Sequence, residues 1–291
     1  MVRTLASHAG NRGSTPLGTT ILNLMMITLT TDFGLQDPYV AQMKGVILSL
    51  NPTVTIVDVT HEIPPQSVMQ ASFALGISFF YFPTGTVHVA VVDPGVGTQR
   101  RGIIISALGH LFVGPDNGIF SFVLERAKGN YRAVHISHIP PIPHPQSSTF
   151  HGRDVFAPVS AILAMGTEIT EFGPEIGDVN LTPLGKPVRE GNTIRGNVIY
   201  IDRFGNAITN ISQEDIPGPF TVQYAVRKKK KIKLAPFYQG AEGELACLFN
   251  SAGFLELFSP MGHAAEMFGI KYGDLVRVIL SPRTDLSMPC A

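Results

Sequence analysis

The sequence predicts an α/β N-terminal domain with a mainly parallel sheet, followed by a smaller all-β, barrel-like C-terminal domain. Short apolar runs alternate with helical patterns through residue 165, which is typical of a parallel sheet. Residues 89–92 are apolar at every position, as in a strand that is buried on both faces. From residue 193 onward, short strand-like runs separated by turn residues replace this alternation.

The N-terminal elements follow from local periodicity. Strands are predicted at residues 27–34, 54–61, 87–92, 102–106, 111–113 and 131–136. Helices are predicted at residues 37–50, 67–80, 119–127 and 155–165. In the first helix, Val40, Met43 and Ile47 recur at helical spacing, and Asn51-Pro52 ends it. We place His151 in the loop at the N-terminus of the last helix, a position that favours anions.

The second half of the chain has a different composition. We predict an N-terminal domain over residues 26–180, a linker over 181–192 and the β domain over 193–291, with residues 1–25 as a disordered extension or start-site artefact. From residue 193 we expect only strands, at 193–202, 207–211, 220–226, 231–235, 244–249, 254–257 and 274–280.

Composition narrows the class of protein. The 291-residue chain is 44% hydrophobic and 15% charged with a formal net charge of zero, which argues against a nucleic-acid binder. The basic run at 227–231 is predicted to be a solvated hairpin turn. Cys247 and Cys290 form neither a disulfide framework nor a zinc site, so we expect a reducing, cytoplasmic setting. No apolar run reaches the roughly 18 residues of a membrane span, and residues 1–25 lack the apolar core of a signal peptide.

Polar side chains stand where predicted strands and helices end. In open α/β sheets, ligands bind outside the carboxyl ends of the strands. Each residue alone has an equally simple structural interpretation: a strand-end Asp caps a turn, and His61 is as easily a packed core residue as a site residue. The candidates in the N-terminal half are Asp32, Asp37, His61, Asp93, Arg100 and His151. The turn Gly114-Pro115-Asp116-Asn117-Gly118 is a further candidate for facing a ligand.

The C-terminal half adds polar turns but no metal cage. Asp202 and Asn206 follow one strand, and Asn250 and Ser251 follow another, where they can hydrogen-bond a hydroxyl or an amine. The chain lacks the glycine-rich phosphate loop, the dinucleotide fingerprint, the nucleophile elbow and the zinc-binding HExxH motif. A nucleoside ligand would therefore lack phosphates.

Six motifs in one colinear order resemble the S-adenosyl-L-methionine (SAM) hydroxide adenosyltransferases, hydrolase relatives of the fluorinase and chlorinase. They span residues 27–280: Thr31-Asp32-Phe33-Gly34, Asp93-Pro94-Gly95-Val96-Gly97-Thr98, Gly114-Pro115-Asp116-Asn117-Gly118, Phe150-His151-Gly152-Arg153-Asp154, Ile201-Asp202-Arg203-Phe204-Gly205-Asn206 and Asn250-Ser251. The resemblance implies a homotrimer whose site lies between one subunit's N-terminal domain and its neighbour's C-terminal domain. The implied reaction, water plus SAM giving adenosine and methionine, needs no metal or cofactor.

The resemblance also implies the roles of individual residues. Asp93, Arg100 and His151 resemble the family's water-activating triad. For substrate binding it implies Asp32 for the ribose hydroxyls, with Asp37 and Tyr39 toward the methionine end. From the second domain it implies Asp202 and Asn206 for the methionine amine, and Asn250 and Ser251 for the carboxylate and adenine region. Phe150 is a further implied substrate-binding residue.

The sequence departs from the halogenases at three points. Ala252 stands where some halogenases have an arginine, Gln66 where the fluorinase has a tryptophan, and no long insertion separates residues 106 and 112. A halide-dependent adenosyltransferase and a non-catalytic SAM- or adenosine-binding module remain as alternatives. Because a halide needs a small dry pocket without a base, His151 and Asp93 favour water as the nucleophile.

Overall fold

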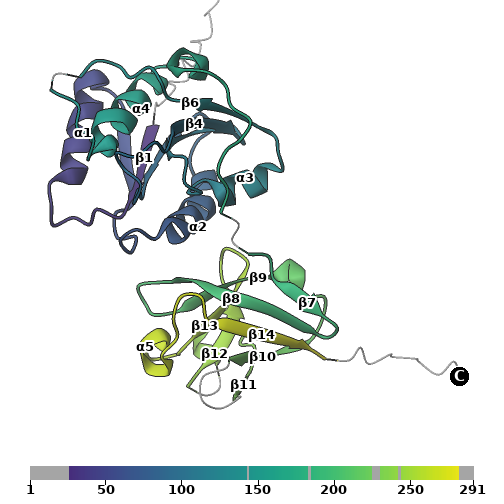
Figure 1. The fold of residues 1–291 in the computed structure, drawn as a ribbon. Helices are drawn as coiled ribbons and strands as arrows, with labels where there is room; N and C mark the ends of the chain where they lie inside the picture. The colour runs from purple at the N-terminus through teal and green to yellow at the C-terminus, as the bar shows by residue number, and fades with distance from the viewer. Residues whose placement is uncertain (1–25, 143, 183–184, 225–229, 242–243, 282–291) are drawn as a thin grey trace, which may run out of the picture.

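The computed structural model describes residues 26–142, 144–182, 185–224, 230–241 and 244–281, arranged as two domains (Figure 1). The N-terminal sheet has the strand order β2-β1-β3-β5-β4-β6. The first four strands pair in parallel, and β4 is antiparallel to both of its neighbours, so the predicted, mainly parallel sheet is confirmed. Its strands are β1 (Met26–Thr31), β2 (Thr55–Thr60), β3 (Val87–Val91), β4 (Gly102–Ala107), β5 (His110–Pro115) and β6 (Tyr131–His135).

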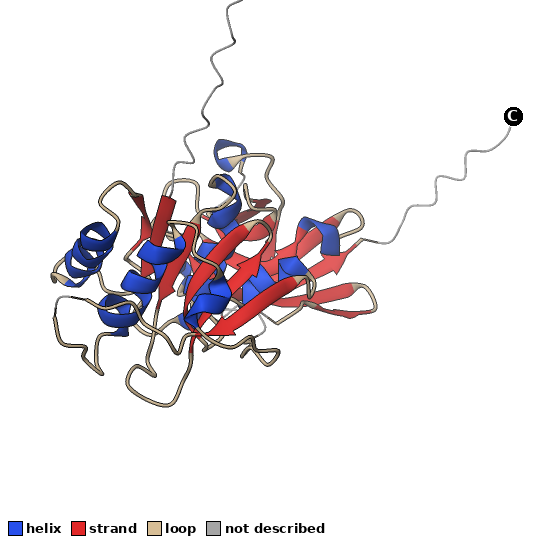
Figure 2. Ribbon diagram, turned by 90° about the horizontal axis from the view of Figure 1, so that it is seen from above, coloured by secondary structure: helices blue, strands red, loops and turns tan. Residues whose placement is uncertain are grey.

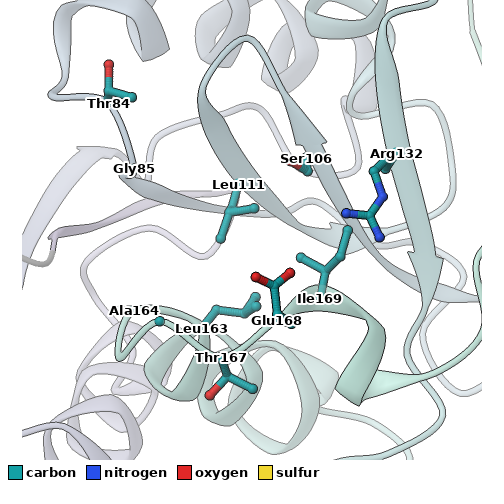
Figure 3. Close-up of a pocket in the computed structure, with 11 residues that line it drawn as sticks. Thr84, Gly85, Ser106, Leu111, Arg132, Leu163, Ala164, Thr167, Glu168 and Ile169 are labelled. Carbon is teal, nitrogen blue, oxygen red and sulfur yellow. The ribbon is translucent and has the colours of Figure 1, made fainter.

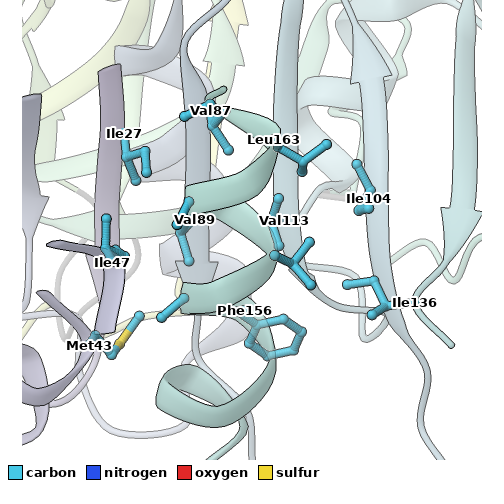
Figure 4. Packing of buried hydrophobic residues seen from close by; sticks show 14 of the residues in the cluster. Ile27, Met43, Ile47, Val87, Val89, Ile104, Val113, Ile136, Phe156 and Leu163 are labelled. Atoms are coloured by element: carbon cyan, nitrogen blue, oxygen red, sulfur yellow. The ribbon is translucent and has the colours of Figure 1, made fainter. Parts of the chain in front are cut away.

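Helices cover both faces of this sheet (Figure 2). On one face, α1 (Tyr39–Leu50) and α4 (Ala157–Leu163) pack against β1, β3, β4 and β5; Figure 4 shows Met43, Ile47 and Leu163 against these strands. On the other face lie α2 (Val68–Ser78) and α3 (Ser121–Ala127). All five residues of β3 are buried, as its uninterrupted apolar pattern predicts for a strand covered on both faces.

The prediction that His151 lies in a loop is wrong. His151 has helical dihedral angles, φ −63° and ψ −22°, and directly precedes a π-helical turn, η2 (Gly152–Phe156), that continues into α4. In this turn the Ala157 N–H donates to the Gly152 carbonyl, five residues back. One extra residue in the turn thus extends the helical segment N-terminally to His151.

The C-terminal domain is a barrel-like sheet with the strand order β11-β10-β14-β8-β9-β13-β12, and β7 pairs with β8. All of these named strand pairs are antiparallel. A bridge between Leu234 and Cys247 joins the segment after β11 to β12, which nearly closes the barrel. Its strands are β7 (Val188–Glu190), β8 (Thr193–Ile201), β9 (Ala207–Ser212), β10 (Phe220–Tyr224), β11 (Lys230–Ile232), β12 (Ala246–Phe249), β13 (Phe254–Phe258) and β14 (Leu275–Leu280).

The expectation that only strands follow residue 193 is also wrong. A short helix, α5 (Ala264–Phe268), begins where the His263 ring accepts a hydrogen bond from the Glu266 N–H at 3.2 Å and ends at Gly269. β7 lies within the segment predicted as a linker, so the domain boundaries themselves stay a prediction. Residues 227–229 of the basic run lie outside the described residues, and β10 and β11 on either side of them pair antiparallel. Residues 1–25 and Cys290 also lie outside the described residues.

The turn at residues 114–118, a candidate for facing a ligand, instead secures the chain as it leaves the N-terminal domain. The Asp116 carboxylate is buried and accepts hydrogen bonds from Arg101 Nη2 at 2.6 Å and from the Asn180 backbone N–H at 2.8 Å. Arg101 also donates to Asp178 at 2.8 Å. Asp116 therefore joins the end of β5 to the segment that leads into the barrel.

Replacing Asp116 by Ala should lower the free energy of unfolding by about 3 kcal/mol, because the change leaves a half-buried guanidinium without its buried carboxylate. Chemical denaturation of the two proteins measures the difference. Asp178→Ala is the matched control: it removes a carboxylate from the same arginine at a position that is 81% exposed, and it should change stability much less. Equal losses in the two variants would contradict this role for Asp116.

Candidate active site

A cavity of about 450 Å³ opens at the carboxyl ends of β1 and β3. This is the edge at which open α/β sheets bind ligands. Five predicted site residues line it: Asp32, Tyr39, Asp93, Phe150 and His151. The lining also includes eight residues that were not predicted as site residues: Phe33, Pro65, Gln66, Val91, Pro94, Val96, Thr149 and Gly152. Gln66 belongs to the loop after β2, and its sequence signals are the neighbouring Pro64-Pro65 pair and its place opposite a fluorinase tryptophan.

Arg100 is not among the residues that line this cavity, but it connects two of them, Asp93 and His151. Its Nε lies 2.8 Å from Asp93 Oδ1 and 2.9 Å from Oδ2, and its Nη2 also donates to Oδ2. The same Nη2 lies 2.8 Å from His151 Nδ1. The side chains of Asp93 and Arg100 are only 5% and 11% exposed, so water screens this charge pair weakly. The structure therefore brings together all three residues of the predicted triad.

The loop that returns Arg100 to Asp93 depends on glycine. Gly97 has φ +78°, and a Cβ atom there would lie 2.6 Å from the Ser148 carbonyl oxygen. A larger residue would push apart the Asp93–Arg100 loop and the segment that leads to His151. Gly97 thus permits the close approach of the two chain segments that carry the triad.

His151 is held in its neutral form. Burial lowers the pKa of its imidazole, and the adjacent Arg100 charge lowers it further, against the weaker opposing effects of Asp93 and Asp154. Since a guanidinium can only donate hydrogen bonds, Nδ1 of His151 must accept, and the neutral ring carries its proton on Nε2. This tautomer is inferred from the hydrogen-bond partners.

Three aromatic rings form one side of the cavity. Phe150 lies 5.7 Å from Phe33 and 5.2 Å from Tyr39 between ring centroids, both edge to face. Phe33 and Tyr39 are 5.9 Å apart. Beside them, Asp32 Oδ2 accepts the Gln66 N–H at 2.8 Å, and Oδ1 has no hydrogen bond to any described residue. The cavity thus combines an apolar aromatic wall with a free carboxylate oxygen.

The other predicted residues lie away from this cavity within the single chain. Asp37 is exposed in the turn before α1. Asp202, Asn206, Asn250 and Ser251 all belong to turns of the barrel, and none lines the cavity. Asp202 Oδ1 accepts the Asn206 N–H at 2.8 Å, which shapes the turn between β8 and β9.

The barrel turns share a polar cluster that sequence reasoning missed. Glu256 is 2% exposed, and it accepts hydrogen bonds from Tyr238 Oη at 2.9 Å and Asn250 Nδ2 at 3.2 Å. Burial raises the pKa of Glu256, and the Asp202 charge adds to that effect. In the sequence, Glu256 is an isolated acid in the apolar strand β13, which alternation would place toward solvent.

A second cavity, of about 380 Å³, lies at the opposite edge of the N-terminal sheet (Figure 3). Arg132 and Glu168 line it together with the apolar Leu111, Leu163 and Ile169. No predicted site residue lines this cavity. Its polar groups stand away from the triad, so we assign the chemistry to the cavity at the carboxyl ends of β1 and β3.

The described residues lack both a metal-binding cluster and a membrane-spanning helix. No group of three or more His, Cys, Asp or Glu residues in this part of the chain could hold a metal ion. In the same part of the chain, no helix combines the length and the apolar character that crossing a membrane requires.

Comparison with known proteins gives matches over most of the chain. The family model of the SAM hydroxide adenosyltransferase N-terminal domain matches residues 27–173, and that of the C-terminal domain matches residues 196–277. The (R)-S-adenosyl-L-methionine hydrolase of Thermus thermophilus is 39% identical over 264 residues, which cover 86% of this chain and 97% of the relative. That of Salinispora tropica is 37% identical over 256 residues, with 87% and 97% covered.

More distant relatives and solved structures agree with this result. A fluorinase of an Actinoplanes species is 28% identical over 290 residues, covering 87% of this chain and 97% of the relative. The crystal structure of an uncharacterized conserved protein from Thermotoga maritima superposes with a TM-score of 0.80 at 35% identity, covering 87% of this chain and all of the other.

Proposed function

This chain belongs to the SAM hydroxide adenosyltransferase family, and on that premise we propose that it is a hydrolase that converts SAM and water to adenosine and L-methionine. The observation that carries the proposal is the contact of Arg100 with both Asp93 and His151, two residues that line the cavity. The sulfonium of SAM is a built-in leaving group, because methionine departs neutral. The reaction needs no metal or cofactor for that step.

The demanding step is activation of water. An oxygen–carbon bond forms at ribose C5′ as the carbon–sulfur bond breaks, and the water gives up one proton to the surroundings. We propose that the Arg100 guanidinium stabilises hydroxide character on the attacking water and that the Asp93 carboxylate takes its proton. His151, whose Nδ1 accepts from Arg100, orients that guanidinium. Holding that water in line with the carbon–sulfur bond adds a proximity contribution.

The remaining lining suits a nucleoside without phosphates. The free Oδ1 of Asp32 is proposed to accept a ribose hydroxyl, and the wall of Phe33, Tyr39 and Phe150 to pack against apolar parts of the substrate. Asp37 extends the binding residues toward the methionine end. The other predicted binding residues, Asp202, Asn206, Asn250 and Ser251, are proposed to reach the cavity from a neighbouring subunit.

A homotrimer would supply those residues. Two observations support it: none of the described barrel residues lines the cavity of its own chain, and the barrel exposes Phe204, in the turn after Asp202, at 75% and Met261 at 99%. Light scattering should give three times the 31.4 kDa chain mass. A monomer that is fully active would contradict the shared site.

Two supporting observations bear on compartment and nucleophile. We propose a cytoplasmic location, in keeping with a free, buried Cys247 whose thiol pKa burial raises to about 12. Water is favoured over halide because the hydrolases at 37% and 39% identity are closer relatives than the fluorinase at 28%. A charged triad at the cavity wall also differs from the dry pocket that a halide needs.

The test is to incubate the protein with SAM without halide and then with chloride or fluoride, and to separate the nucleosides by chromatography. Hydrolysis predicts equal amounts of adenosine and methionine in every buffer, with ¹⁸O from labelled water in the 5′-hydroxyl. A 5′-halo-nucleoside would establish the halogenase instead. Binding of SAM without any product would establish a binding module.

A further inference from the structure

The turn after β1 carries two cavity residues, Asp32 and Phe33, and depends on the loop after β2 for its shape. The Gly34 N–H donates to the His61 carbonyl at 2.8 Å, and the Gln66 N–H donates to the Asp32 carboxylate at 2.8 Å. The Phe33 N–H donates to the Thr31 hydroxyl at 3.2 Å. This turn is therefore held by two hydrogen bonds to the loop and by one to a side chain of β1.

The side chain of His61 lies behind that turn rather than in the cavity. It is 3% exposed, and its Nδ1 lies 2.8 Å from the Thr31 hydroxyl oxygen. Its Nε2 lies 3.1 Å from Asp58 Oδ1, at an angle that departs from that of a regular hydrogen bond, and has no other partner among the described residues. Asp58 in turn accepts from Lys44 Nζ at 2.6 Å.

Lys44, Asp58, His61 and Thr31 thus form a series of polar contacts. In this series, each contact determines which atom donates and which accepts in the next. Burial would raise the pKa of Asp58, but hydrogen bonds from Lys44 and His61 outweigh it and hold that pKa below its usual value. Facing a carboxylate, Nε2 of His61 carries the ring proton, so Nδ1 is an acceptor. The Thr31 hydroxyl then donates to Nδ1 and keeps its lone pairs for the Phe33 N–H.

The strand geometry is adapted to this arrangement. Leu29 of β1 pairs with Asp58, but the next residue, Thr30, pairs with Thr60, so β2 carries one extra residue at Val59. A bulge of this kind kinks a strand and re-aims its side chains, and bulges are frequent beside active sites. Here the extra residue, Val59, lies between Asp58 and His61, the two members of the series that lie in β2 and directly after it.

We propose that Asp58, His61 and Thr31 position the Asp32–Phe33 turn, so that His61 acts on substrate binding without touching the substrate. The inference rests on the proposed function, because the turn matters through the nucleoside that Asp32 and Phe33 would bind. His61 and Thr31 are positioning residues. Loss of the series displaces one carboxylate and one ring of the cavity together, and leaves the triad in place.

The test is an isosteric pair at Thr31. Thr31→Val removes only the hydroxyl and should raise KM for SAM, and Kd for adenosine by calorimetry, about tenfold with little change in kcat. Thr31→Ser keeps the hydroxyl and should stay close to the parent values. The same loss of affinity is expected in His61→Leu, with partial recovery in His61→Asn, whose side-chain oxygen can replace Nδ1.

Thr28→Val is the matched control. Thr28 is fully buried on the same strand and bonds the ring of another histidine, His88, at 2.7 Å, but it lines no part of the cavity. It should change the unfolding midpoint and leave KM and Kd unchanged. A Thr31→Val enzyme with parent KM and Kd overturns the inference. If that variant does not fold, Asp58→Ala at a half-exposed position should also raise KM, and an unchanged KM there overturns the inference.

The proposed function and the positioning role can each fail without the other. Absence of adenosine formation by the parent enzyme refutes the proposed function. In that case, the difference in Kd for adenosine between Thr31→Val and Thr31→Ser still tests whether the Thr31 hydroxyl positions the turn. Normal hydrolysis by the parent, together with parent affinities in Thr31→Val, refutes only the positioning role.

Discussion

Replacing Arg100 by Gln should lower kcat for SAM hydrolysis by about 10²–10³-fold, the range seen when one preorganised donor to a developing negative charge is removed. Glutamine keeps a hydrogen-bond donor beside Asp93 but removes the positive charge that stabilises hydroxide. KM should change little, because the contact strengthens only as the water loses its proton. Steady-state rates of adenosine formation measure both constants.

Arg132→Gln provides a matched control for Arg100. Arg132 also pairs with a carboxylate, Glu175, in the same domain, but it lies at the opposite edge of the sheet. Its replacement should leave kcat within a factor of about two, since exposed pairs contribute little. A large rise in KM with unchanged kcat in Arg100→Gln would show that Arg100 binds substrate instead of activating water.

The second large effect concerns acid stability. His88 is fully buried, and burial, helped by the charge of His110, lowers its pKa from 6.5 to about 3. Between these two values the unfolded chain binds a proton that the folded chain does not, so stability falls as pH falls through this window. At 1.36 kcal/mol per pKa unit, the loss over the whole window is on the order of 5 kcal/mol.

His88→Gln should flatten this part of the pH dependence, measured as the free energy of unfolding by urea between pH 7 and pH 4. Because carboxylates with lowered pKa values also lose stability in acid, the slopes of parent and variant are compared with each other. His138→Gln, at an exposed position, should leave the slope of the parent unchanged. Equal slopes for the parent and His88→Gln would show that His88 titrates normally.

Local sequence patterns predicted the N-terminal sheet and the position of its cavity because the relevant signals are local. The run that ends at Asp93 is apolar until the strand stops, and the following glycines mark the turn. The same reasoning placed Asp32 at the end of β1. Both residues line the cavity. The helix at α5 was missed because its five residues are too few to show a helical period.

The contacts between distant segments could not be predicted in this way. For His61 the sequence left a core role and a site role equally open, and its ring proves to be buried yet bonded to Thr31. Alternation in its strand would place Glu256 toward solvent, yet it is 2% exposed and accepts hydrogen bonds from Tyr238 and Asn250, which both lie outside that strand. Asp202 and Asn250 would reach a substrate only through the packing of another subunit. Local patterns in the sequence of one chain do not predict that packing.

The π-helical turn that follows His151 has a consequence for insertions and deletions. Successive residues of a helix are rotated by about 100°, so loss of one residue from Gly152–Phe156 would turn His151 by about that angle relative to α4. The shortened helix would be more regular, yet the imidazole would point away from Arg100. Single-residue deletions in this turn are thus compatible with folding but incompatible with the triad, so the length of this segment is constrained independently of its composition.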